Sequence, residues 1–298
     1  MNVISLVVIL LLQVFIQATA NAREYPMPEQ GSRLLGEMQY HQVKKGDYFQ
    51  ALAEHYDVGF LALLAANPTV DPFLPDVGQQ LTIPSQLILP YVAYQGIVIN
   101  LPELRLYYFH PDANKVSVFP VGIGRQGLST PKVLSYIGEK RKDPVWRPPK
   151  AMRERYLAEN GKPLAMEILP GPDNPFGKYA LRIGTSEYLI HGSNQRFGIG
   201  MRSSAGCIRM FDEDIAWLYK HVSINTPVRI IDQNVKMSYE KSGQRLIEIH
   251  SPLSDEQGNN PGVLITDVIK RFVGESNSRW LQLAPIIKEP TGLVITLD

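Results

Sequence analysis

The chain has 298 residues, 44% of them hydrophobic, and its formal net charge is +1 at pH 7. This length allows two or three domains with a substantial core. The near-zero charge excludes a large basic face, so nucleic acid is not an expected partner. The sequence holds one cysteine, Cys207, which excludes an intramolecular disulfide framework.

The N-terminus has the pattern of an export signal. Residues 3–16 form an apolar run interrupted only by Ser5 and Gln13, and small-x-small sequences ending at Ala20 and Ala22 follow it. This pattern predicts a signal peptide in residues 1–22. The run is shorter than the roughly 20 residues that span a bilayer. No Lys or Arg precedes it, which leaves an uncleaved anchor as the alternative.

A linker and a small module are expected next. Residues 23–39 are rich in Pro and Gly and are interpreted as a linker, and residues 40–84 as an independent unit. Apolar periodicity and breakers within the unit predict strand, helix, helix and strand at 41–43, 48–56, 60–66 and 80–83.

The βααβ unit resembles the LysM module of cell-wall proteins. The resemblance is carried by Lys45-Gly46-Asp47, Asn67-Pro68 and Leu81-x-Ile83-Pro84. It implies binding to a glycan that contains N-acetylglucosamine. A folding unit without a ligand is the alternative.

The remainder is predicted to be mainly β with some α, so the fold class is α+β. Residues 95–232 contain β-branched and aromatic runs at 96–100, 105–109, 116–119 and 226–231. Helical periodicity is sparse before Asp212, which is expected to cap a helix that ends near residue 221. Residues 239–298 are expected to form a small subdomain, with strands at 245–249 and 292–296 and a helix at 261–272.

One glycine pattern is misleading. Gly122-x-Gly124-x-x-Gly127 matches the dinucleotide fingerprint, but Pro131 prevents the helix that must follow it. The sequence therefore predicts no nucleotide cofactor.

The chemically informative stretch runs from residue 188 to residue 210. Residues 188–190 are predicted as a strand that delivers His191 to a cleft, and the glycine-marked segment 197–200 turns the chain back. We expect this loop to bring Cys207 close to His191. A thiol is a weak nucleophile until an adjacent imidazole accepts its proton and pairs with the thiolate.

The neighbours of Cys207 suit acyl chemistry. Ser204, Ala205 and Gly206 are small, so they leave room for a substrate backbone and free peptide N–H groups for an oxyanion. The planar guanidinium of Arg209 can bind a substrate carboxylate.

A bland interpretation competes with this one, because a lone cysteine is most often an inert buried side chain. In an exported protein, however, an unpaired cysteine favours an intermolecular bridge or a reactive thiol. The Gly-Cys-x-Arg context favours the reactive thiol.

These motifs together resemble the L,D-transpeptidases with a YkuD-type catalytic domain. The resemblance covers about residues 95–231 and is carried by His191-Gly192, Ser204-x-Gly206-Cys207-x-Arg209, Gly122-x-Gly124, Thr130-Pro131, Pro144-x-Trp146 and Phe197-Gly198-Ile199-Gly200. The order of signal, LysM module, catalytic domain (95–232) and C-terminal subdomain (239–298) resembles the periplasmic Gram-negative members.

The resemblance implies specific catalytic roles. Cys207 is the nucleophile, His191 is the general base, and the backbone carbonyl of Gly192 orients the imidazole. The family uses no metal and no cofactor. Many members carry a second histidine where this chain has Ala205, so we expect altered tuning of the thiol and retained activity.

The resemblance also implies how substrate is bound. Ser204, Gly206 and Arg209 match positions that shape the site, bind substrate or stabilise an oxyanion. Lys132 and Arg202 are further candidates for binding carboxylates of the stem peptide, although a solvated surface role is as good an interpretation for each.

The implied partner is peptidoglycan, with its glycan on the LysM module and its tetrapeptide stem at Cys207. The thiolate attacks the bond between diaminopimelate and D-alanine, and the resulting thioester passes its acyl group to an amine. That amine belongs to a second stem, giving a 3→3 cross-link, or to an outer-membrane protein, and the sequence leaves both open.

Two other functions remain as alternatives. One is a cysteine hydrolase on the same fold, acting as an L,D-carboxypeptidase or amidase, and the other is a non-catalytic wall-binding protein. A zinc peptidase is disfavoured, because His191, Cys207 and His221 lack the spacing of zinc ligands.

Overall fold

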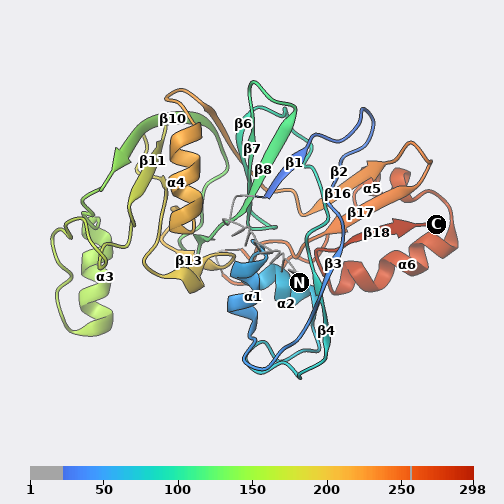
Figure 1. Ribbon diagram of the computed structural model, residues 1–298, viewed down its shortest axis with the longest axis horizontal. Coiled ribbons are helices and arrows are strands. Elements are labelled where there is room, and N and C mark those ends of the chain that lie inside the picture. Colours follow the sequence, from blue (N-terminus) through green and yellow to red (C-terminus); the bar gives the residue numbers. More distant parts are fainter. Residues whose placement is uncertain (1–22, 256) are drawn as a thin grey trace, which may run out of the picture.

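The computed structural model describes residues 23–255 and 257–298, and the predicted signal peptide lies outside them. A small N-terminal module, a large central sheet and a C-terminal subdomain follow one another along the chain (Figure 1). This arrangement confirms the predicted α+β class. Within the described residues, every helix is too short or too polar to span a bilayer.

The N-terminal module has the predicted βααβ order. Strands β3 (Gln39–Gln42) and β4 (Gln80–Ile83) pair antiparallel, and helices α1 (Phe49–His55) and α2 (Phe60–Ala66) lie between them in sequence. Apolar side chains from all parts of the unit form a separate buried core. The helices were predictable because each places its apolar residues on one face.

The central sheet has, within the described chain, nine strands in the order β1-β8-β7-β6-β15-β10-β11-β12-β14. The strands are β1 (Arg23–Pro26), β6 (Gly96–Asn100), β7 (Arg105–Phe109), β8 (Lys115–Pro120), β10 (Val133–Lys142), β11 (Tyr179–Ile183), β12 (Leu189–His191), β14 (Ile208–Arg209) and β15 (Pro227–Ile231). The pairs β15–β6 and β12–β14 are parallel, and the other pairs are antiparallel.

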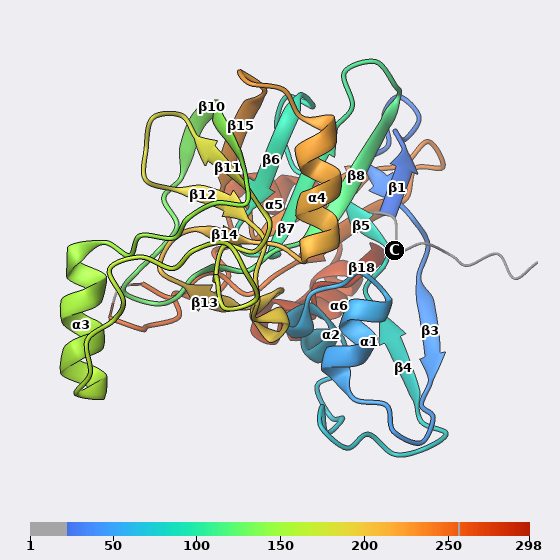
Figure 2. The same ribbon diagram turned by 60° about the vertical axis from the view of Figure 1, so that its left-hand side comes forward.

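Helix α4 (Asp212–His221) lies over one face of this sheet (Figure 2), and it contacts β11 and β12. It buries Ile215 and Leu218 against the apolar side chains of the strands. Asp212 is the first helical residue and does not cap the helix as expected, since its carboxylate instead accepts from the Ser193 N–H at 3.2 Å. The carboxylate thus ties the helix to the segment after His191.

Residues 23–39, expected to be a linker, contain two strands. Strand β1 pairs with β8 at the edge of the central sheet, and β2 (Leu34–Leu35) pairs with β5 (Leu87–Ile88). The sequence of β1 is Arg-Glu-Tyr-Pro, whose charges and proline suit an edge strand. Such a strand lacks the apolar alternation that identifies strands in a sequence.

Two helices were not expected. Helix α3 (Lys150–Asn160) buries none of its residues, so it has no apolar periodicity to reveal it. In the C-terminal subdomain, α6 (Asn277–Lys288) follows α5 (Asp267–Val273). Helix α5 begins at Asp267, later than the predicted helix 261–272, and its N-cap is Thr266, whose hydroxyl accepts from the Ile269 N–H.

The C-terminal subdomain is a three-stranded antiparallel sheet packed on these two helices (Figure 1). Its strands lie in the order β16 (Val235–Tyr239), β17 (Arg245–Ile249) and β18 (Val294–Leu297). The remaining short strands, β9 (Ile123–Gly124) and β13 (Arg202–Ser204), pair with each other near Cys207.

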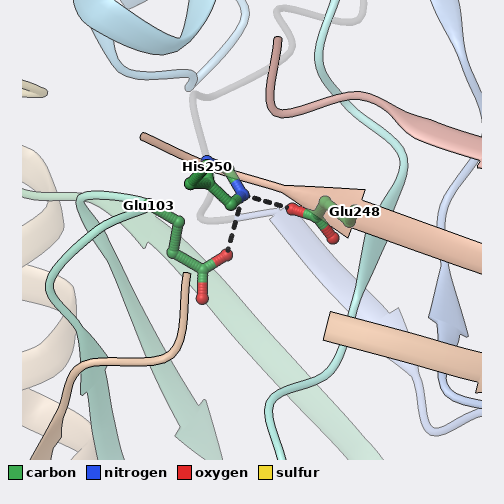
Figure 3. A group of neighbouring side chains, drawn as sticks. All are labelled: Glu103, Glu248 and His250. Carbon is green, nitrogen blue, oxygen red and sulfur yellow. Dashed lines mark hydrogen bonds and ion pairs between the residues drawn. The ribbon is translucent and has the colours of Figure 1, made fainter. Parts of the chain in front are cut away.

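A buried ionic cluster joins this subdomain to the central sheet. The Lys236 ammonium lies 2.6 Å from Glu103 and 2.9 Å from Glu248, and all three side chains are fully buried. Arg105 Nη1 lies 3.0 Å from Glu248 and 3.2 Å from Glu103. His250 lies between the same two carboxylates, 2.7 Å from Glu248 (Figure 3).

Two carboxylates and an imidazole at this spacing also suit a metal ion. Here the Lys236 ammonium already bridges Glu103 and Glu248, so it takes the position between the carboxylates that a metal ion would occupy. Burial acts to raise the pKa of Glu248, but Lys236, His250 and Arg105 together hold this pKa below its ordinary range. The cluster is therefore a charged bridge between two domains.

Removing Lys236 should destabilise the whole chain. In Lys236→Met, two buried carboxylates lose the ammonium between them and keep Arg105 as a shared partner, and breaking a buried pair costs about 3–5 kcal/mol. Lys241→Met is the matched control, because Lys241 is 64% exposed and pairs with Glu29 at the surface. Urea unfolding of both variants measures the difference, and equal midpoints would contradict a bridging role for the cluster.

The N-terminal module touches the loop that connects β12 to β13. The Leu61 N–H donates to the Gly200 carbonyl at 3.2 Å, and Gly59 packs directly against Gly200. From the same loop, Arg196 forms ion pairs with Glu54 of α1 and Glu213 of α4. The module is thus docked on the segment between His191 and Cys207.

Gly200→Ala should loosen this docking. Gly200 has φ +71°, and an added Cβ would lie 2.3 Å from Gly59 Cα. In the control Gly127→Ala, φ is +73° and the new Cβ meets nothing within 4 Å. Both variants lose about 1–2 kcal/mol to backbone strain, but only Gly200→Ala should also show a larger radius of gyration by small-angle scattering. Equal scattering profiles would show that the contact does not hold the module.

Candidate active site

The strand pair β12–β14 places the reactive side chains. Ile190 pairs with Ile208 and His191 with Arg209. Ile190 and Ile208 are fully buried in the core, so the alternation of a strand points His191 and Arg209 to the opposite face. Cys207, one residue before Ile208, lies on that same face. The structure therefore places His191, at the end of β12, and Cys207, just before β14, on the same face of the sheet.

Both residues line a cavity of about 690 Å³. Its wall also includes Ser204, Ala205 and Arg209 from the segment around Cys207. Residues from β10, β11 and the segments beside His191 complete it, and the main ones are Arg141, Trp146, Arg147, Met152, Phe176, Arg182, Glu187, Tyr188 and Gln195. A concave site with aromatic walls and a few charged groups is typical of a ligand-binding pocket.

His191 is buried and fixed in one orientation. Its Nδ1 lies 2.5 Å from the Gly192 carbonyl oxygen, which can only accept, so Nδ1 carries the proton and Nε2 is left as an acceptor. The Phe176 ring packs against the imidazole with centroids 4.7 Å apart. Burial lowers the pKa of His191 to about 3, with Arg209 acting in the same direction and the Gly192 contact opposing it.

Cys207 is mainly a neutral thiol in this environment. Burial raises the pKa of the thiol, and the Leu189 N–H and Arg209 only partly oppose that shift. Because His191 is also neutral, the free protein holds a thiol beside an unprotonated imidazole. These two pKa shifts favour a neutral thiol and a neutral imidazole over a thiolate–imidazolium pair in the free protein.

A hydrogen-bonded turn presents the thiol. Ser204 Oγ donates to the Cys207 carbonyl at 2.6 Å and accepts from the Gly206 N–H at 3.1 Å. Thr130 Oγ1 donates to the Gly206 carbonyl at 2.9 Å. Gly206 has φ +109°, and an added Cβ would lie 2.9 Å from the Tyr188 ring, so only glycine fits.

The same turn corrects one expectation. The Gly206 N–H was expected to be free for an oxyanion, but Ser204 Oγ occupies it. A serine hydroxyl two residues earlier competes for this donor, which is the usual behaviour of serine in turns.

Of the three cations proposed for carboxylates, only Arg209 lines the cavity. Its backbone pairs with Gly122, its Nη1 donates to Gln195, and its buried Nε has no hydrogen-bond partner among the described residues. Arg202 instead donates to Ser254 at 2.6 Å outside the cavity, and Lys132 is exposed away from it.

Sequence reasoning did not identify the cations and aromatic side chains opposite Cys207. Trp146 and Phe176 flank the segment that contains α3, and their rings pack edge to face at 6.3 Å. The Pro144-x-Trp146 motif was a usable signal for this wall. Arg141 and Arg182 had no local signal, because their position depends on the pairing of β10 with β11.

Comparison with known proteins agrees with this geometry. Residues 94–230 match the family model of the L,D-transpeptidase catalytic domain, YkuD. The chain is 40% identical to the probable L,D-transpeptidase YbiS of Escherichia coli K12 over 94% of each protein. The chain belongs to the L,D-transpeptidase family.

Other parts of the chain match the same family. The L,D-transpeptidase C-terminal domain matches residues 234–296, and the LysM domain matches residues 41–84. This L,D-transpeptidase is also 46% identical to the probable L,D-transpeptidase YcfS of E. coli K12, over 82% of the chain and 78% of the relative. It is 39% identical to the probable L,D-transpeptidase ErfK/SrfK of Salmonella typhimurium LT2, over 93% of the chain and 92% of the relative.

The protonation state of Cys207 can be read by alkylation, since the sequence has no other cysteine. Because burial raises the thiol pKa, the rate with iodoacetamide should be low at pH 7 and rise through and beyond the ordinary thiol pKa of about 8.5. Glutathione, alkylated in parallel, is the control, and its alkylation rate should rise at a lower pH than that of Cys207. A rate plateau between pH 5 and 8 would instead reveal a preformed thiolate–imidazolium pair.

Proposed function

We propose that this L,D-transpeptidase acts on peptidoglycan by cysteine acyl transfer, with Cys207 as nucleophile and His191 as general base. The observation that carries the proposal is the shared face of β12 and β14. It presents a thiol beside an imidazole whose Nδ1 is held by Gly192 and whose Nε2 can accept a proton.

The first step forms a thioester. His191 Nε2 takes the Cys207 proton as sulfur attacks the carbonyl that links diaminopimelate, the third stem residue, to D-alanine. The C–N bond then breaks, and the imidazolium returns the proton to the leaving amine of D-alanine. Because thiol and imidazole start neutral, charge develops only during attack, where the guanidinium of Arg209 lies on the same face.

The second step transfers the acyl group. An acceptor amine attacks the thioester, His191 accepts the proton of the amine, and the thiol is regenerated by that proton. The acceptor is the amine of a second stem or of an outer-membrane protein. Walls formed by Trp146, Phe176 and Tyr188 limit access of water to the thioester, which favours transfer over hydrolysis.

The LysM module adds a glycan-binding function to the same chain. Its contact with the loop after β12 supports a fixed position of the LysM domain relative to Cys207. Peptidoglycan lies outside the cytoplasmic membrane, so the substrate and the predicted signal peptide together favour a periplasmic location.

Mass spectrometry of a disaccharide-tetrapeptide tests the proposal. The wild-type chain should release D-alanine and give cross-linked dimers or exchanged D-amino acids, and Cys207→Ala should give neither. His191→Ala should lose about 10²- to 10⁴-fold in rate, the usual contribution of a general base.

Each contrary result has a distinct meaning. Tripeptide without dimers, even with added amines, would identify a hydrolase. Identical products from wild type and Cys207→Ala would remove the cysteine mechanism. Unchanged substrate with a folded wild-type chain would leave a wall-binding protein.

A further inference from the structure

The active-site face of the sheet continues beyond β12 into β11 and β10. In the register of these strands, Arg141 pairs with Ala180, Ala180 with His191, and His191 with Arg209. This is one row of residues across four strands, from Arg141 to Arg209. Since residues in register share a face, Arg141 points to the same side as the catalytic imidazole.

A second row runs parallel to the first, two residues along each strand. Glu139 pairs with Arg182 and Arg182 with Leu189, and Leu189 lies beside Cys207 because Ile190 pairs with Ile208. Adjacent strands are about 4.8 Å apart, so the backbone of Arg182 lies roughly 10 Å from that of Cys207. Arg141, Arg182, Leu189 and Cys207 all line the cavity.

Glu139 holds both guanidinium groups in place. Arg141 donates from Nε and Nη2 to the two oxygens of Glu139, at 2.6 and 2.8 Å. Arg182 donates from Nε to Glu139 at 3.0 Å and from Nη1 to the Ser186 carbonyl at 2.7 Å. The trio carries one positive charge in excess. Its arginines remain accessible, with side chains 39% and 25% exposed.

The rest of the cavity wall does not neutralise this excess charge. Among the described residues that line it, Glu187 is the one acid, against four arginines. A site built in this way favours a ligand with more than one carboxylate, and a fixed pair of guanidinium groups suits one carboxylate particularly well.

We propose that Arg141 and Arg182, positioned by Glu139, bind the side-chain carboxylate of the donor's third residue. The inference rests on the proposed function, and it assigns these residues to substrate selection and not to bond cleavage. In diaminopimelate, six carbon–carbon bonds separate the distal carboxylate from the reacting carbonyl, or about 7 Å when extended. The backbones of Arg182 and Cys207 lie roughly 10 Å apart, two strand spacings. Because the arginine side chain covers part of that distance, a span of about 7 Å reaches from the sulfur to the guanidinium.

Arg209 lies elsewhere in the same row and keeps a different role. It is on the strand next to His191, so it is closer to the reacting carbonyl and to the carboxylate of the leaving D-alanine. The two ends of the site would therefore recognise the carboxylates of the third residue and of D-alanine separately.

The test compares two tetrapeptide donors that differ only in whether the distal carboxylate is free or amidated. Wild type should prefer the free acid. Arg182→Gln and Arg141→Gln should each lose about 10- to 100-fold in kcat/KM for the free acid, mostly in KM, because a charge-assisted hydrogen bond is lost. Both variants should handle the amidated donor almost as wild type does. Arg182→Lys should recover part of the preference.

Lys150→Gln is the matched control. Lys150 is 82% exposed, pairs with Glu154 on α3 and does not line the cavity, so the change removes a nearby charge outside the site. Iodoacetamide alkylation of Cys207 should be unchanged in all the arginine variants, which separates a lost subsite from a disturbed nucleophile.

Two results would overturn the subsite. One is a wild-type chain with equal kcat/KM for both donors. The other is an arginine variant whose kcat/KM falls by the same factor for both donors, because such a loss indicates a structural role. If wild type turned over neither donor, the proposed function would fail. Calorimetric binding of the two peptides to Cys207→Ala would then judge the subsite alone, and equal affinities would overturn it.

Discussion

The register between β12 and β14 is the constraint on which the active site depends. Ile190 and Ile208 anchor it, since both are fully buried in the core. A shift of one residue would turn His191 into the core and an isoleucine into the cavity, because side chains alternate along a strand. Polar contacts made by Ser204 and Thr130 then adjust the turn before β14. The geometry of the proposed catalytic site is thus set by apolar burial and refined by hydrogen bonds.

The loop that joins these two strands is also the place where the LysM domain docks. Arg196 and Gly200 lie between His191 and Cys207 in sequence and contact the module directly. On the other side, the Lys236 cluster joins the C-terminal domain to the turn between β6 and β7. Both domains that flank the central sheet are therefore attached to it through specific contacts. These contacts favour a fixed position of the LysM domain relative to the peptide-binding cavity.

Local patterns made part of this structure predictable. Helices α1, α2 and α4 and strands β6, β7 and β8 each bury a face or lie wholly within the core, and burial leaves an apolar pattern in the sequence. The candidates Cys207, His191, Ser204 and Arg209 share a cavity because they belong to one short segment and its partner strand.

The elements that were missed lack such a pattern or depend on distant pairing. Helix α3 buries nothing, and β1 is a polar edge strand. Arg141 and Arg182 reach the cavity only through the register of β10 and β11 with β12, and β10 lies far from the other two strands in sequence. The fate of the Gly206 N–H likewise depended on the rotation of one hydroxyl, which no spacing rule specifies.

Burial of Cys207 and His191 also bears on how a lone cysteine is protected from oxidation. Oxidation of a thiol follows its thiolate character, and the raised pKa of Cys207 keeps that character low in the free protein. The unprotonated Nε2 of His191 remains available, so the proton can leave when an electrophilic carbonyl arrives at sulfur. Reactivity is then linked to occupation of the cavity by substrate, and the same desolvation that suppresses the thiolate at rest strengthens the electrostatic contacts made during attack.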